Sequence, residues 1–134
     1  MSSKKPPKIS IFIALGLVLT SNTAWPHHNM TALYDLNDRV VFTGTFTKLD
    51  LRNPHIQFFV ESKNTQGQME SWAVEGPPPS FFRTRDIGKE DFEGANGKTV
   101  TVEVSRARDH STSGLLRVLN LPDGKVVSAC QQKC

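Results

Sequence analysis

The stretch VVFTGTFTKLDL, residues 40–51, decides how the rest of this chain of 134 residues is interpreted. Its apolar residues Val40, Phe42 and Phe46 share one parity, and threonines fill the other. Such period-two alternation, with β-branched residues on the polar side, predicts a β-strand with one buried face. Gly44 interrupts the apolar parity, and the apolar residues that follow fall on the opposite one. A glycine followed by a change of parity predicts a β-bulge or a strong coil, as in a strand that serves two sides of a barrel.

Further strands follow in the same alternating pattern. Residues 98–105 are the clearest example, because three valines there alternate with threonine and glutamate. A run of three prolines at 77–79 stops the third strand, since proline cannot donate a hydrogen bond to a β-ladder. Ser80 is expected to cap a short helix. The expected strands are residues 40–51, 55–62, 69–75, 98–105, 115–121 and 125–128, with a helix at 80–85 and an irregular stretch from there to 97.

This order of elements predicts an all-β fold. We expect a small five- to six-stranded OB-like barrel with a short helix between strands three and four. A small β-sandwich is the alternative, but it would contain more strands and no helical insertion. The expected organisation is a signal peptide at 1–24, an extended N-terminal segment at 25–38, the OB-like β-barrel domain at 39–128, and a C-terminal tail with two cysteines at 129–134.

The first two dozen residues have the composition of a secretory signal peptide. Lys4, Lys5 and Lys8 precede an apolar run over residues 9–19, and small and polar residues close the segment. The run is shorter than the about 20 apolar residues that cross a membrane. We therefore expect a periplasmic or secreted protein with no membrane attachment after cleavage.

Export changes the charge balance. The chain has 16 lysines and arginines against 13 aspartates and glutamates, and the three lysines of the signal account for the whole excess. Nucleic-acid binding depends on clustered basic residues against phosphates. The expected mature chain has no such excess, so nucleic acid is excluded as a partner, whereas a protein partner stays open.

Three histidines are candidate metal ligands. His27 and His28 are adjacent near the expected start of the mature chain, and His55 follows Asn53 and Pro54 at the start of the second strand. Imidazoles and a backbone amide in an extended segment can share copper or zinc. The alternatives are a polar tail for the pair, and for His55 a ring that supports a turn through hydrogen bonds. His110 is expected to be exposed.

Enzymatic motifs are absent from the sequence. There is no G-x-S-x-G, no H-E-x-x-H and no glycine-rich phosphate loop, so we expect a protein that is not an enzyme. Glu75, three residues after Trp72, is a candidate acid, but a glutamate in this position more often ends a strand and accepts a hydrogen bond from a neighbouring loop. Five aromatic residues are candidates for a ligand-stacking platform or for core packing, and core packing is favoured for Trp72. They are Phe58, Phe59, Trp72, Phe81 and Phe82.

Cys130 and Cys134 are the only cysteines. In an oxidising compartment they can pair with each other, with another chain, or hold a surface metal ion. A disulfide between them would close a very small loop that encloses no core, so its effect on stability would be slight.

The chain contains, in this order, the strings PHHNMTALYD, VFTGTFTKLDLRNPHIQFFVE, ESWAVEGPPPSFFRTR and RARDHSTSGLLRVLNLPDG. This order resembles domain-of-unknown-function family 6152, small exported bacterial proteins with a His-His start, Asn-Pro-His and Trp-x-x-Glu-Gly. The resemblance brings no activity with it. It implies that the family's characteristic positions are His27, His28, Asn53, Pro54, His55, Trp72, Glu75 and Gly76 in this sequence.

Taken together, the sequence predicts an exported binding domain. The leading hypothesis is binding of a metal ion, copper or zinc, through His27, His28 and His55. The alternative is a structural or interaction module whose barrel groove binds a peptide or a glycan.

Overall fold

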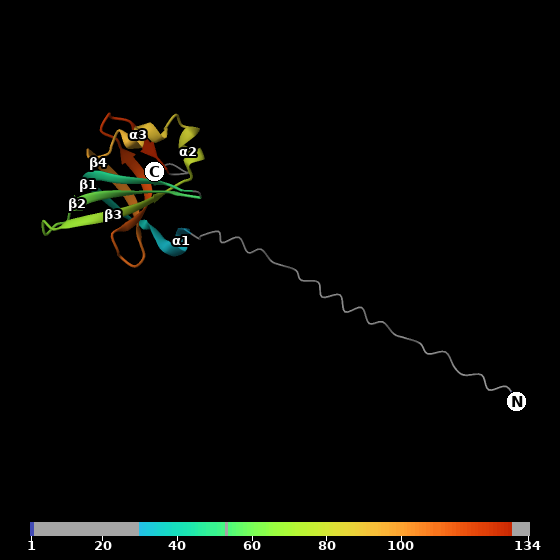
Figure 1. Cartoon of the computed structure of the whole chain (residues 1–134). Coiled ribbons are helices and arrows are strands. Elements are labelled where there is room, and N and C mark those ends of the chain that lie inside the picture. The colour runs from blue at the N-terminus through green and yellow to red at the C-terminus, as the bar shows by residue number, and fades with distance from the viewer. Residues whose placement is uncertain (2–29, 53, 130–134) are drawn as a thin grey trace.

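The computed structural model describes Met1 and residues 30–52 and 54–129. This part of the chain is all-β: six strands, mostly antiparallel, are joined in one sheet and accompanied by short helices (Figure 1). None of the helices in the described residues is long and apolar enough to cross a membrane. The elements are α1 Met30–Leu33, β1 Tyr34–Leu51, β2 Ile56–Lys63, β3 Met69–Gly76, α2 Pro79–Arg83, α3 Lys89–Glu93, β4 Thr99–Ala107, β5 Ser113–Asn120 and β6 Val126–Ser128.

The strand order brings segments that are distant in sequence together. The sheet runs β3-β2-β1-β4-β5-β6, and β3 also pairs with β5. Long β1 pairs with β4 through its first part and with β2 through its last part, both antiparallel. The β3–β5 pairing is parallel and joins Ala73, Val74 and Glu75 to residues 113–115. As a result, the end of β3 lies beside the start of β5.

The buried faces are those that the alternation predicts. Ile56, Phe58 and Val60 of β2 are fully buried, and the three valines of β4 are buried with them. Phe46 stacks on Phe58 with ring centroids 5.3 Å apart, and Phe42 of the same strand stacks on Trp72 at 4.5 Å. The favoured interpretation of Trp72 as a core residue is therefore confirmed.

The prediction of a bulge at Gly44 is wrong in its position. The register of β1 against β2 shifts between Phe46 and Lys48, whereas Gly44 stays in register opposite Val100. Gly44 matters for a different reason, because a Cβ atom there would lie 2.3 Å from the Glu61 carbonyl oxygen. The glycine therefore lets the β2 backbone approach β1 at the point where β1 changes partners.

Strand β1 also begins six residues earlier than expected. Tyr34 pairs with Ala107, and the register is irregular until Arg39 pairs with Ser105. This irregular stretch hides the alternation that would have revealed the strand, because a register shift breaks the period of two.

Two expectations for the segment between β3 and β4 are corrected. Ser80 is not the helix cap: α2 begins at Pro79, its N-cap is Pro78, and no side chain caps it. The stretch predicted as irregular contains α3, which follows Gly88. The two helices lie together at one end of the sheet, and α1 lies at the other end (Figure 1). Helix α3 is held by Phe92, which is buried and meets the edge of the Phe82 ring at 5.4 Å.

Candidate functional site

A buried tyrosine, a glutamate and a histidine form a hydrogen-bonded chain on the outer face of the sheet. Trp72 and Val74 of β3 point into the core, so Glu75 points outward. The Tyr34 hydroxyl donates to Glu75 Oε2 at 2.7 Å, and His55 Nδ1 lies 2.5 Å from Glu75 Oε1. Both oxygens of one carboxylate are therefore engaged, each by a residue from a different element.

The β2–β3 hairpin places His55 beside Glu75. Ile56 pairs with Gly76 and Gln57 pairs with Glu75, so the residue before β2 lies next to the end of β3. The Ile56 N–H also donates to the Pro77 carbonyl oxygen at 3.3 Å. A Cβ atom on Gly76 would lie 3.0 Å from Ile56 Cγ1, so glycine gives the Ile56 side chain the space it occupies.

Burial differs along the chain of three residues. The side chains of His55 and Glu75 are 28% and 24% exposed, whereas Tyr34 is only 6% exposed. Burial, followed by the hydrogen bond to Glu75 and the negative charge of that residue, raises the pKa of Tyr34 to about 12. Tyr34 is therefore a neutral hydrogen-bond donor at physiological pH.

The contact between His55 and Glu75 sets the chemistry of the imidazole. A carboxylate accepts hydrogen bonds, so it favours the ring form with its proton on Nδ1. In a neutral ring of that form, Nε2 carries a free lone pair. Such a nitrogen can bind a metal ion or accept a proton, and carboxylates commonly orient metal-binding histidines in this way.

The other residues singled out from the sequence have different surroundings. His27, His28, Asn53, Cys130 and Cys134 lie outside the described residues. Pro54 is exposed, Gly76 is buried, and His110 is exposed in a turn with a positive φ of 59°. Within residues 30–52 and 54–129, no group of three or more His, Cys, Asp or Glu side chains is arranged to hold a metal ion.

The aromatic residues do not form one exposed platform. Phe58, Trp72 and Phe82 are buried. Phe59 and Phe81 are partly exposed, and each lies beside a cation: Lys48 Nζ is 5.6 Å from the Phe59 ring centroid, and Arg85 Cζ is 3.6 Å from that of Phe81.

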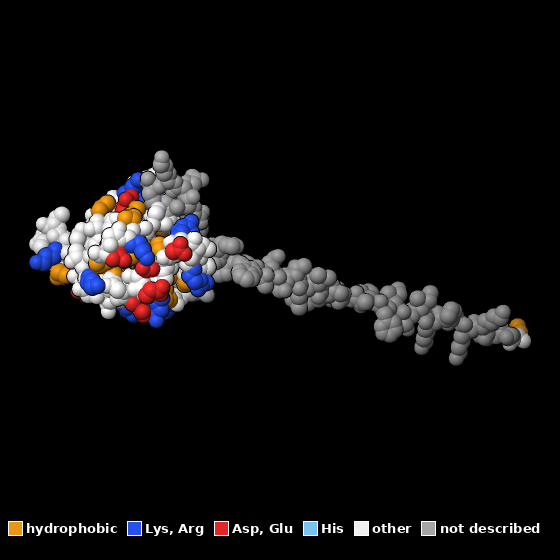
Figure 2. All heavy atoms as spheres, turned by 90° about the horizontal axis from the view of Figure 1, so that it is seen from above, with side chains coloured by type: hydrophobic (Ala, Val, Ile, Leu, Met, Phe, Trp, Pro, Cys, Tyr) orange, Lys and Arg blue, Asp and Glu red, His pale blue; other side chains and the backbone are white. Residues whose placement is uncertain are grey.

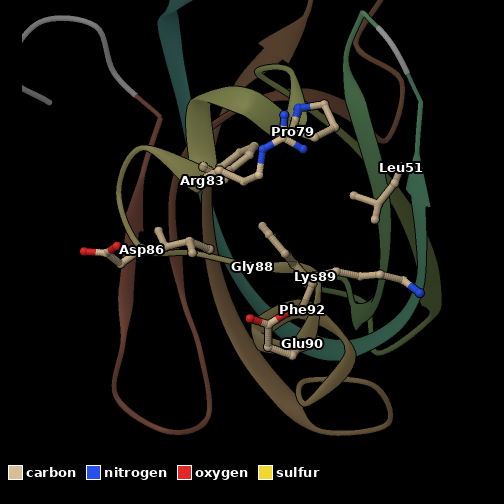
Figure 3. Close-up of a pocket in the computed structure, with 10 residues that line it drawn as sticks. Leu51, Pro79, Arg83, Asp86, Gly88, Lys89, Glu90 and Phe92 are labelled. Atoms are coloured by element: carbon tan, nitrogen blue, oxygen red, sulfur yellow. The ribbon is translucent and has the colours of Figure 1, made fainter.

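A cavity of about 600 Å³, which His55 does not line, lies between the end of β1 and the helices α2 and α3 (Figure 3). Its apolar lining includes Phe82, Ile87 and Phe92 from the helical segment, together with Leu51 of β1. Four charged residues of mixed sign also line it, although Asp86 points away from the space in Figure 3. They are Arg83, Asp86, Lys89 and Glu90.

Charges are also mixed on the wider surface. On the face seen in Figure 2, basic and acidic side chains are interspersed, with no continuous patch of one sign. This face has none of the clustered basic charge that nucleic-acid binding requires.

Sequence reasoning missed Tyr34, although it is the only tyrosine in the chain. The hydroxyl group of a buried tyrosine usually has a hydrogen-bond partner. The partner of Tyr34, Glu75, is 41 residues further along the sequence. The His55–Glu75 contact, in contrast, could have been deduced. Counting outward from the turn after Lys63 pairs Gln57 with Glu75 and leaves His55 beside it.

The family of unknown function DUF6152 matches residues 15–117. The chain belongs to this family. The match contains Tyr34, His55 and Glu75, and it ends before Cys130 and Cys134. Searches of curated proteins and of solved structures give no match. Membership therefore identifies the family without supplying an activity.

Proposed function

We propose that this chain is an exported domain that binds copper or zinc through Nε2 of His55, together with His27 and His28. The observation that carries the proposal is the contact between His55 Nδ1 and Glu75 Oε1. Histidines that bind metals usually donate their other ring N–H to a carboxylate or carbonyl, which fixes the ring and its tautomer. His55 has this partner and is partly exposed, so its Nε2 is suited to a metal ion from solution.

The point at which the chain enters the sheet supports the participation of His27 and His28. Tyr34 reaches Glu75 with its hydroxyl group, and Glu75 contacts His55. His28 is six residues before Tyr34, and helix α1 occupies most of this short stretch. We include the adjacent histidines because they are close to Tyr34 in sequence and because three imidazoles are a suitable set of ligands for copper or zinc.

The finer description of the fold belongs to the same proposal. We propose that the strands form an OB-like barrel, and the supporting observation is that β3 pairs with both β2 and β5 while β1 pairs with both β2 and β4. A helical connection between β3 and β4 also fits this fold. The proposed location outside the cytoplasm depends on the N-terminal sequence pattern alone. That the domain is not an enzyme stays a prediction.

Calorimetric titration of the processed, metal-free protein with ZnCl₂ or CuCl₂ tests metal binding. We expect about one equivalent to bind, with weaker binding at acid pH because protons compete for the imidazoles. His55→Ala should weaken binding strongly, and a His27→Ala, His28→Ala double variant should do the same. His110→Ala is the matched control, because His110 lies in a separate exposed turn. Equal effects of His55→Ala and His110→Ala would contradict the proposal.

Mass spectrometry of the native protein supplies two further readouts. The mass gives the true N-terminus, which decides whether export leaves His27 and His28 in the mature chain. Spectra recorded under non-denaturing conditions give the mass of any metal ion retained. A mature chain that starts after His28 would leave His55 without these two ligands and would contradict the three-histidine site.

A second candidate function is binding of a peptide or glycan, and the cavity between β1 and the two helices favours it. The cavity has apolar side chains beside charged ones, which suits an amphipathic ligand. NMR titration with soluble oligosaccharides and short extended peptides tests this function. Leu51→Asp should abolish shifts of α2 and α3 signals, whereas Val126→Asp, an exposed position on β6, should not. Absence of shifts with both ligand classes would contradict this second function.

A further inference from the structure

We propose that Tyr34 is a positioning residue for His55: its hydroxyl group holds Glu75 in the orientation that keeps the His55 proton on Nδ1 and presents Nε2 to the metal. This inference rests on the metal-binding function proposed above and adds to it a residue that is not a ligand. Tyr34 itself is not a ligand in this scheme, because its hydroxyl group is directed to the Glu75 carboxylate.

The orientation of the Glu75 carboxylate depends on two contacts. The terminal torsion of a glutamate is broad, so a carboxylate held by one contact can rotate. Each oxygen of the Glu75 carboxylate has its own partner: Tyr34 contacts Oε2 and His55 contacts Oε1. The tyrosine hydroxyl group therefore removes the rotation that would otherwise disturb the contact with the imidazole.

Tyr34 is itself held in place by its surroundings. Its ring is buried, and its backbone pairs with Ala107 at the start of β1. The neighbouring residues are fixed by Arg108, whose N–H donates to the Leu33 carbonyl oxygen and whose Nε–H donates to that of Thr31, both at 2.9 Å. Arg108 also forms an ion pair with Asp35 at 3.6 Å. The residues on both sides of Tyr34 are thus attached to the β4–β5 connection.

Tyr34→Phe is the direct test, because it removes only the hydroxyl oxygen and keeps the ring. We expect zinc affinity to fall about tenfold, as for other outer partners of metal-binding histidines. We also expect the ¹⁵N NMR signals of His55 in the metal-free protein to move from a single Nδ1–H tautomer toward a mixture. Thr43→Val is the matched control: it removes another side-chain hydrogen bond of β1, from Thr43 to Thr101, far from Glu75 in the register of the sheet.

The tautomer signal separates this inference from the function on which it rests. Wild-type protein that binds no zinc would overturn the proposed function, and the His55 signals would still show whether Tyr34 fixes the ring. Tyr34→Phe with wild-type tautomer and wild-type affinity would overturn the role of Tyr34. Reduced affinity with an unchanged tautomer would overturn it as well, because the effect would then come from a general loss of structure. Thermal unfolding of all three proteins measures that loss.

Discussion

Gly44, the one glycine of the long strand β1, should not tolerate a side chain. A Cβ atom at this position would lie 2.3 Å from the Glu61 carbonyl oxygen and 2.9 Å from Val60 Cγ1. Cβ atoms essentially never approach other heavy atoms closer than 3.0 Å. The nearest atom here, the Glu61 carbonyl oxygen, belongs to the backbone and cannot rotate away, so β2 would have to move away from β1. This movement would disturb the pairing of Thr45 with Glu61 and of Phe46 with Val60, which is buried in the core.

The magnitude follows from two opposing terms. Gly44 is not in the left-handed region, so alanine is compatible with its backbone conformation and would otherwise stabilise the protein by about 0.4–1 kcal/mol through the unfolded state. Forcing extra atoms into a packed site costs about 1–3 kcal/mol. We therefore expect Gly44→Ala to lower the free energy of unfolding by about 1–2 kcal/mol, and Gly44→Val to lower it further.

Urea unfolding followed by tryptophan fluorescence measures this change. Trp72 is buried in the core and stacked on Phe42 of the same strand, so it reports on the region concerned. Val41→Ala is the control, because Val41 is 63% exposed and its truncation should change the free energy by less than about 0.5 kcal/mol. A Gly44→Ala protein as stable as the wild type would refute the close approach of β1 and β2.

Three further predictions concern other parts of the chain. Replacing Cys130 and Cys134 by serine should leave the melting temperature nearly unchanged, since a loop between them would enclose no core; a large drop in a calorimetric scan would show that the tail contacts the domain. The hydrogen bond from Lys125, and next the N–H of Gly88, hold the pKa of Asp91 below its usual range, so its contribution to stability is present above about pH 4 and is lost as the pH falls further. The stability difference between wild type and Asp91→Asn should accordingly shrink in acid urea titrations, and a difference independent of pH would contradict this. Arg108→Ala should speed amide hydrogen exchange at the start of β1 while β4 stays protected, because it removes the side-chain hydrogen bond to the Thr31 carbonyl and the ion pair with Asp35; unchanged exchange there would contradict this.

Much of the sheet could be predicted because its strands have one buried face. The alternation in β2 and β4 placed their core residues correctly, and the ends of these two strands were found to within two residues. Helix α3 was missed because its five residues, KEDFE, contain one apolar side chain, which is too few to show a helical period. Its position depends on Phe92 packing against Phe82, a contact that only the tertiary fold supplies.

The candidate site was predictable only in part. His55 and Glu75 were each selected for their chemistry, and each had a plain structural alternative in which it made a hydrogen bond near a strand end. The structure shows that these alternatives describe one contact, because the two residues are each other's partners. What the sequence could not supply is Tyr34, whose place beside Glu75 requires β1 to pair with β4 and β5 to pair with β3.

The hairpin geometry also accounts for the spacing of the two motifs that carry the family resemblance. In Trp-x-x-Glu-Gly, the alternation of β3 turns Trp72 into the core and Glu75 outward, and Gly76 leaves room for the Ile56 side chain. Asn-Pro-His ends immediately before Ile56, on the partner strand of the same hairpin. The open end of one hairpin therefore combines a core residue, Trp72, a hydrogen-bond acceptor, Glu75, and His55. The packed tryptophan and the close approach at Gly76 hold the strand ends, so the backbones of Glu75 and His55 lie side by side, and the Tyr34 hydroxyl group then holds the Glu75 carboxylate.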